Sequence, residues 1–240
     1  MPLPSYNQLR SALVAAQKTN NGGLGFHMWG VIVDRTGTVR AVTYTGDAYG
    51  DQWPGSRVIA AAKAKPDTIT YASIGSGSVG HLTMTLLSEK AGCKLVHVPY
   101  RGGGPAMNDA IAGHVDLIIG SAALVMPQVN ARTIVPLLQT GKTRMTNLPD
   151  TQTAIDAGFT GFESYAWWGV FAPAGTPKPI IERFAAALGD SLRDPLVSKT
   201  LTESLQISLR LGNAEDEAKF LAEQMALWGP VVKENNIKSD

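Results

Sequence analysis

A loop rich in glycine and serine, between a short strand and a helix, holds the residues best suited to binding chemistry. The chain reads YASIGSGSVGH from Tyr71 to His81. Such a loop at a helix start directs several backbone N–H groups to one point, where the helix dipole adds positive potential. The residues that this pattern offers to an anion are Ser73, Gly75, Ser76, Gly77, Ser78 and His81. The sequence therefore predicts an anion cradle suited to a carboxylate or a phosphate, in which His81 is either a charged member or a solvated helix residue.

Further candidate residues follow other predicted strands of the same sheet. Arg101 and Gly102 come after the next strand and open the next helix, and the guanidinium could form a forked pair with the distal carboxylate of a dicarboxylic ligand. Ser121 follows the third strand, at the edge where α/β sheets bind ligands. Adjacent residues of a strand face opposite ways, so one ring of Trp167 and Trp168 can reach the ligand, and we predict Trp168. Each of these residues also has a structural alternative to ligand binding. Arg101 can be a surface residue beside a flexible turn, and Ser121 can be the cap of the next helix. Both tryptophans can pack in the core.

The spacing Gly75-x-Gly77-x-x-Gly80 also satisfies the dinucleotide-binding pattern, after a strand and at a helix start. An NADP-binding oxidoreductase is therefore an alternative function. Two features count against it. The preceding strand is short and polar, whereas a central strand of a dinucleotide-binding sheet is a buried apolar run. About twenty residues further on, Tyr100-Arg101 stands where an acidic residue would bind the ribose hydroxyl of NAD, so only NADP with its 2′-phosphate would fit. A purely structural turn is a further alternative.

No constellation in the sequence carries enzyme chemistry. The histidines at 27, 81, 97 and 114 have no metal-ligand spacing, and one histidine in the first part of the chain is weak ground for haem ligation. Gly141-Lys142-Thr143 resembles the end of a phosphate-binding loop, but Pro136 occupies the position of its first glycine. We therefore expect a protein that is not an enzyme and uses no cofactor or metal.

The bulk properties exclude several partners. The 240 residues have a net charge of +1, with the basic residues spread along the chain, which argues against nucleic-acid binding. No run of about eighteen apolar residues is present, so direct membrane insertion is not expected. Cys93 is the only cysteine, which rules out an internal disulfide. The first residues lack the pattern of an export signal, so the chain as written would stay in the cytoplasm.

From residue 66 onward the pattern alternates strands and helices, which predicts an α/β fold. The predicted strands are Thr68–Ala72, Lys94–Pro99, Val115–Ile119, Ile134–Leu138, Tyr165–Ala172 and Ile207–Leu211. The predicted helices are Val79–Lys90, Pro105–Ala112, Ala122–Ala131, Thr151–Ala157, Lys178–Leu192 and Ala214–Lys233.

The first part of the chain has a different pattern. A helix over Tyr6–Lys18 precedes a β-hairpin of Met28–Asp34 and Val39–Tyr44, and an alanine-rich helix then runs from Ser56 to Ala64. The change of pattern at Ala64-Lys65-Pro66 marks a candidate domain boundary. The sequence leaves open whether the hairpin joins the later sheet or packs separately.

The second part resembles the Bug-type solute-binding proteins, the receptor subunits of tripartite tricarboxylate transporters. The likeness rests on the cradle and on the segments 96–102, 110–116, 148–151, 168–177 and 228–233, in the expected order. It implies a type II periplasmic-binding-protein fold of two α/β lobes, and a ligand of the di- or tricarboxylate or acidic amino acid class. It also implies a membrane transporter subunit as partner and a periplasmic location.

Residues 1–64 do not match that family. Trp29–Gly37, Asp47 and the helix ending in Ala62-Lys63-Ala64 resemble the first half of a GlcG/HbpS-like domain. We therefore expect a fusion with three parts: this partial segment, a Bug-like second lobe over 65–162, and the remainder of an incomplete first lobe over 163–240. The resemblance implies that the loop opposing the cradle is missing, which would impair binding. A folded fusion remnant that binds no ligand is the remaining alternative.

Overall fold

The computed structural model describes residues 4–18, 29–34, 38–46, 54–210 and 212–238. His27 and the predicted hairpin turn at residues 35–37 lie outside this range, so the expectations for them stay predictions.

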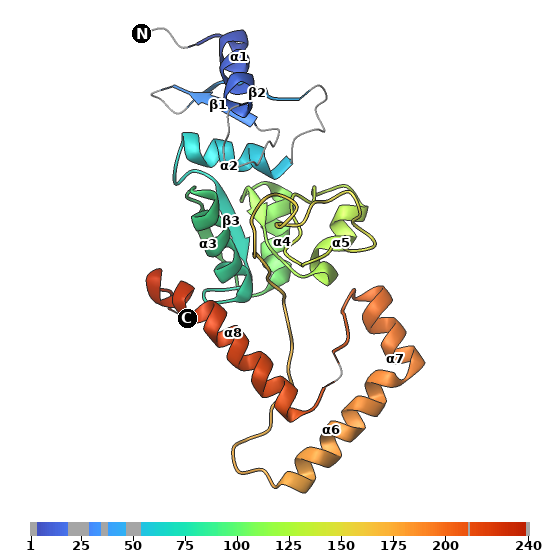
Figure 1. Ribbon diagram of the computed structural model, residues 1–240. Helices are drawn as coiled ribbons and strands as arrows, with labels where there is room; N and C mark the ends of the chain where they lie inside the picture. The colour runs from blue at the N-terminus through green and yellow to red at the C-terminus, as the bar shows by residue number, and fades with distance from the viewer. Residues whose placement is uncertain (1–3, 19–28, 35–37, 47–53, 211, 239–240) are drawn as a thin grey trace.

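A three-stranded parallel sheet forms the centre of the chain (Figure 1). Its strands are β3 (Thr70–Ser73), β4 (Val96–Pro99) and β5 (Leu117–Ile118), in the order β4-β3-β5. They lie within the predicted ranges but are shorter, apart from the added Ser73. Parallel strands need a crossover connection. The connections here are α3 (Val79–Ala91) and α4 (Gly103–Ala112), and α5 (Ala122–Asn130) follows β5.

Two small apolar clusters hold this part together. Ala72 of β3 packs with Ala106 and Val115 between the sheet and α4. On the other side, Leu82 of α3 packs against Trp228 of the last helix, α8 (Ala214–Glu234), together with its Val231. The second cluster fixes the end of the chain to the helix that carries the cradle.

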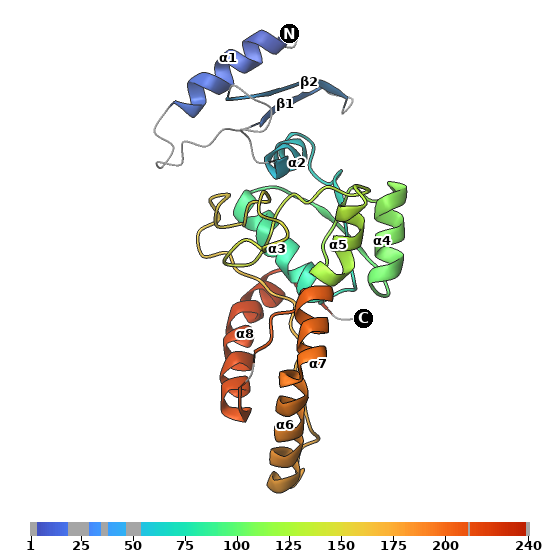
Figure 2. The same ribbon diagram turned by 90° about the vertical axis from the view of Figure 1, so that its right-hand side faces the viewer.

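The first part of the chain forms a layer of its own. Helix α1 (Tyr6–Gln17) and helix α2 (Pro54–Ala64) pack on opposite sides of an antiparallel pair, β1 (Trp29–Val33) and β2 (Val39–Tyr44) (Figure 2). The predicted hairpin is confirmed. It makes a separate two-stranded sheet and does not extend the central one.

The segment from residue 132 to residue 164 differs from the prediction. No strand forms over Ile134–Leu138 and no helix over Thr151–Ala157, so both expectations were wrong. The chain instead folds as successive turns, joined by a single bridge between Gln139 and Thr153. Side-chain hydrogen bonds replace regular structure here, because the buried amide of Gln139 satisfies several backbone groups at once.

The remainder of the chain consists of helices without a sheet. Helix α6 (Lys178–Arg193) is close to the prediction, and α7 (Pro195–Lys199) with a π-helical turn, η1 (Thr200–Ser204), extends it. The predicted strands Tyr165–Ala172 and Ile207–Leu211 are absent among the described residues, which contradicts both predictions. A strand exists only when a neighbouring strand accepts its hydrogen bonds. No described segment lies beside either stretch to do so.

No helix in the described part of the chain is both long enough and apolar enough to cross a membrane. The three-part division expected from the sequence stays a prediction.

Gln139 gives a test of the turn-rich segment. Its side-chain amide donates to the carbonyls of Leu148 (2.8 Å) and Thr151 (2.6 Å) and accepts from the N–H of Met145 (2.8 Å). Gln139→Leu would leave the Thr151 carbonyl and the Met145 N–H without this partner, whereas the Leu148 carbonyl keeps the hydrogen bond from the Thr151 N–H. Each unsatisfied buried group costs about 1–3 kcal/mol. We expect the free energy of unfolding in urea to fall by at least about 2 kcal/mol.

Gln152→Leu is the matched control, since the Gln152 side chain makes no hydrogen bond in the described structure. A loss for Gln139→Leu no larger than that of the control would contradict the assigned role.

Candidate functional site

The amino termini of three helices meet at one edge of the central sheet. Because β4, β3 and β5 are parallel, their carboxyl ends lie at the same edge, and α3, α4 and α5 each begin within a few residues of it. The strand order places the β3–α3 loop between the other two. Backbone N–H groups and helix dipoles therefore converge there, where open α/β sheets bind ligands.

The β3–α3 loop has the conformation that its glycines allow. Gly75 and Gly77 have φ values of +140° and +73°, which side-chain-bearing residues rarely adopt. Ser78 then caps α3, accepting a hydrogen bond from the N–H of His81 at 3.3 Å. A side chain at Gly80 would lie 3.1 Å from Ile119, so this position keeps α3 close to the end of β5.

Ser73 supports the loop from inside. It is fully buried, and its hydroxyl donates to the carbonyl of Gly75 (3.1 Å) and accepts from the Gly75 N–H (3.3 Å). The same oxygen lies 2.6 Å from Nε2 of His97 on β4. Ser73 therefore fixes the shape of the loop, whereas the sequence analysis placed its hydroxyl against the ligand.

Ser76 and the first turn of α3 supply the available donors. The N–H and hydroxyl of Ser76 and the N–H groups of Val79 and Gly80 have no hydrogen-bond partner within the described residues. Gly77 differs, since its N–H donates to Nδ1 of His81 at 3.1 Å. A cradle of four neutral donors thus remains at the start of the helix.

His81 is neutral in this arrangement. Its ring is half-buried and stacks on the ring of His97, with 3.8 Å between centroids, and burial lowers its pKa below the usual value. Its Nδ1 accepts the N–H of Gly77, which requires an unprotonated nitrogen. Neither sequence-based reading, a charged ligand group or a solvated helix residue, matches this geometry.

Arg101 and Gly102 lie at the start of α4, beside the cradle. Gly102 has a φ of +114° and no side chain caps the helix, which leaves the N–H groups of Gly103 and Gly104 without partners in the described structure. The Arg101 side chain is exposed. The start of α4 thus also presents backbone N–H groups without partners, next to the exposed Arg101.

Ser121 begins α5 on the other side of β3. Its backbone is extended at the cap position, and its hydroxyl makes no capping bond to the helix. The sequence analysis had helix capping as the alternative role of Ser121, and the missing bond leaves the hydroxyl available at the sheet edge.

The two tryptophans face different ways, as predicted for adjacent residues, although their segment is not a strand. Trp167 packs edge-on against Phe220 of α8, with 5.3 Å between ring centroids. Trp168 is 70% exposed and makes no ring contact with a described residue. The structure therefore does not bring Trp168 onto the cradle.

A cavity of about 690 Å³ opens beside the cradle. Ser76 and His81 line one end, and Asn235 with Lys238, from the end of the chain, line another part. Its walls include Tyr71, whose pKa burial raises to about 12, so the phenol stays protonated and can donate. The acidic and basic side chains of the lining are equal in number, two of each: Asp67, Glu89, Lys94 and Lys238.

Sequence reasoning missed His97 and Tyr71. They pair across the parallel strands β3 and β4, and their rings stack with 5.0 Å between centroids. Aligning the two predicted strands would have placed His97 two residues before the end of β4, next to the cradle. Within the described residues no group of three metal-ligating side chains is present.

Comparison with known proteins shows that most of the chain matches one protein family. The family model described as the tripartite tricarboxylate transporter family receptor matches residues 56–237. A UPF0065 protein in the tcbD-tcbE intergenic region of Pseudomonas sp. (strain P51) is 33% identical over 186 residues, which is 77% of this chain and 55% of that protein. The chain thus spans about half the length of this curated relative.

Two solved structures are similar in fold. The structure of R. palustris Rpa4515 with adipate has a TM-score of 0.69 and 26% identity, and covers 88% of this chain and 65% of that one. MatC (Rpa3494) from Rhodopseudomonas palustris with bound malate has a TM-score of 0.64 and 27% identity, and covers 75% of this chain and 63% of that one. The α/β fold, with an incomplete lobe, is therefore that of the periplasmic binding proteins. Given the match to the family model over three quarters of its length, this chain belongs to the tripartite tricarboxylate transporter receptor family, the Bug-type solute-binding proteins.

Proposed function

We propose that this chain binds a small carboxylate at the start of α3 and carries out no catalysis. The observation that supports this proposal is the set of unpartnered donors at Ser76, Val79 and Gly80, in the middle of the sheet edge. A carboxylate accepts several hydrogen bonds, and helix N–H groups provide them together with the favourable end of the dipole.

A second charged group of the ligand would reach the start of α4. Arg101 with the N–H groups of Gly103 and Gly104 forms a second anion-binding position beside the first. A ligand with carboxylates at both ends would use the two positions together. The ligand class is therefore that of di- or tricarboxylates or acidic amino acids, and adipate and malate, bound by the two solved relatives, are suitable probes.

The biological setting follows from the family and belongs to the proposal. A receptor of this kind delivers its ligand to a membrane subunit of a transporter, and it acts in the periplasm. The chain spans about half of its curated relative. We therefore propose that these 240 residues by themselves bind the carboxylate with lower affinity than a two-lobed receptor does. Fewer donors around an anion leave more water and a lower affinity. The GlcG/HbpS-like assignment of residues 1–64 remains a further proposal.

Ser76→Asp tests the cradle directly. The new carboxylate would lie beside the bound one, and two like charges about 4 Å apart repel by about 4 kcal/mol at an effective dielectric constant of 20. We expect the affinity for adipate or malate in isothermal titration calorimetry to fall by at least about a hundredfold. The melting temperature should stay near that of the unmodified chain.

Asn130→Asp is the matched control. It adds the same charge at an exposed position at the far end of α5, away from the sheet edge. Unchanged carboxylate affinity in Ser76→Asp would refute the site.

Binding of NADP that is lost in Arg101→Ala would instead support the dinucleotide alternative. A flat titration with all these ligands would support a folded remnant.

The neutral state of His81 predicts how binding depends on pH. Because its pKa lies below the usual value and its Nδ1 accepts from Gly77, the imidazole stays uncharged above pH 6.5 and adds no attraction for the anion. We expect the dissociation constant for adipate to change less than about threefold between pH 6.5 and pH 8. Calorimetry at several pH values measures this. Affinity that rises about tenfold as the pH falls from 8 to 6.5 would show that an imidazolium holds the ligand.

A further inference from the structure

The hydrogen bond between Gly77 and His81 fixes the tautomer of the imidazole. The N–H of Gly77 donates to Nδ1 of His81, so Nδ1 carries no proton. A neutral imidazole has one N–H group, which must then be on Nε2. Burial lowers the pKa of this ring, which keeps the ring neutral at pH 7. The Nε2–H of His81 is therefore a hydrogen-bond donor without formal charge.

This donor is unused in the part of the chain that the structure describes. No described residue accepts a hydrogen bond from Nε2 of His81. The neighbouring imidazole differs, because Nε2 of His97 lies 2.6 Å from the hydroxyl of Ser73. The two rings stack with 3.8 Å between their centroids, which holds the His81 ring in place. A positioned donor without a partner is a group that a ligand can use for specificity.

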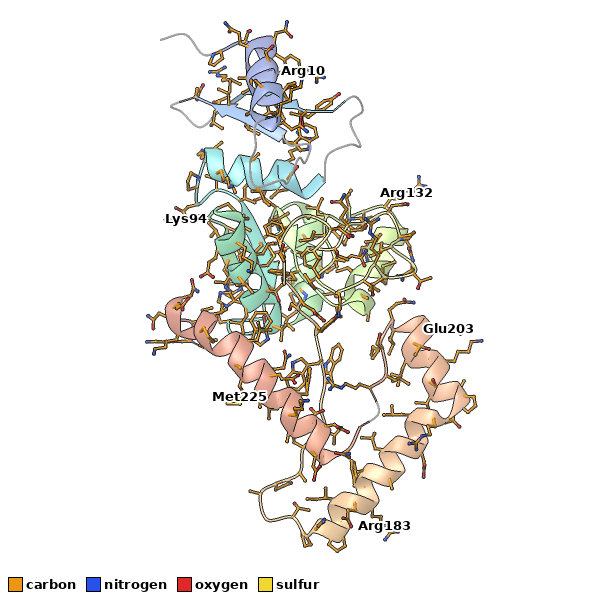
Figure 3. The ribbon with its side chains drawn as sticks, viewed as in Figure 1. Arg10, Lys94, Arg132, Arg183, Glu203 and Met225 are labelled. Atoms are coloured by element: carbon orange, nitrogen blue, oxygen red, sulfur yellow. The ribbon has the colours of Figure 1, made fainter. Side chains whose placement is uncertain are left out.

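The cavity beside the cradle is where this donor can meet a ligand. His81 and Ser76 both line this cavity of about 690 Å³, and Ser76 is also a cradle residue. The lining comes from residues 67–97 and from the end of the chain at 235–238, which Trp228 holds against α3. Lys94, one of the lining residues, is labelled next to α3 in Figure 3. The cavity is therefore built without residues 163–210 of the incomplete lobe.

The lining indicates which chemical group the cavity accepts. Its two acidic and two basic side chains cancel in formal charge, so it offers no net attraction to a further carboxylate. The hydroxyls of Thr85 and Ser88 donate to carbonyls of their own helix, at 2.9 Å and 2.8 Å, so their protons are in use. An uncharged acceptor, the oxygen of a hydroxyl or carbonyl group, fits the unused Nε2–H of His81.

We propose that His81 is a specificity residue of the carboxylate site and selects ligands with a hydroxyl or carbonyl oxygen next to the bound carboxylate. The carboxylate occupies the donors at the start of α3, and the Nε2–H of His81 donates to the neighbouring oxygen. Ligands of this class are 2-hydroxy and 2-oxo acids. A methylene group at the same position would leave the donor without this hydrogen bond. The inference rests on the proposed carboxylate site.

Pairs of ligands that differ by one oxygen atom test the selection. Isothermal titration calorimetry compares malate with succinate, and 2-hydroxyadipate with adipate. We expect the hydroxy acid to bind about three- to tenfold more tightly in the pair whose length suits the site, because it makes one more hydrogen bond. Equal affinity within every pair that binds would overturn the role of His81 and leave the carboxylate site intact. Binding of none of the four acids would overturn both.

Two substitutions of His81 separate contact with the ligand from support of the loop. The amide oxygen in His81→Asn lies near the place of Nδ1, so it can accept from Gly77, but no donor remains at Nε2. The longer side chain in His81→Gln places an amide N–H near Nε2 and gives up the acceptor for Gly77. We expect His81→Asn to bind both acids of a pair equally. His81→Gln should keep the preference and weaken both acids by a similar factor.

Thr85→Val is the matched control. It removes a polar group from the same cavity, but one whose proton already belongs to the His81 carbonyl, so the preference should remain. A preference that persists in His81→Asn, or disappears in Thr85→Val, would contradict the assignment.

Nitrogen-15 NMR of the imidazole gives a reading that a purely structural role would not produce. Long-range spectra at pH 7 should show His81 as the neutral Nε2–H tautomer. Malate should shift its Nε2 resonance more than succinate does. The opposite tautomer, an imidazolium, or equal shifts with both acids would overturn the proposal.

Discussion

Parallel pairing of β3 between β4 and β5 is the constraint on which the site depends. Each of these strands has only a few residues, and β5 has two, yet their shared direction brings three chain reversals to one edge. The helices that follow must begin there, with their unsatisfied N–H groups pointing outward. An anion site then needs no cationic side chain of its own. It needs only glycines to shape the loop and a buried serine to hold it.

The buried polar groups near the cradle act as a support. Ser73 joins the loop to β4 through His97, and His97 stacks on His81, which in turn holds Gly77. Burial lowers the pKa of the His81 ring, which stacks on the His97 ring with 3.8 Å between their centroids.

The strand, Gly/Ser loop and helix that position the candidate site could be predicted from the sequence, because they follow one another along the chain as local features. The roles of Ser73 and His81 could not, since both depend on His97, which lies on a neighbouring strand. The predicted strands Tyr165–Ala172 and Ile207–Leu211 failed for a related reason. Their residue pattern suits a strand, but a strand also needs a partner, and no described segment supplies one. The turns around Gln139 follow from side-chain hydrogen bonds that no periodic pattern reveals.

A backbone amide NMR titration with adipate tests the central claim most directly. The donors of the cradle are backbone groups, so binding must move their own resonances. The account predicts the largest shift changes at Ser76, Val79 and Gly80, followed by Gly103 and Gly104, with little change along the hairpin β1–β2. Saturable changes centred elsewhere, or none at the first turn of α3, would contradict a carboxylate site at the start of that helix.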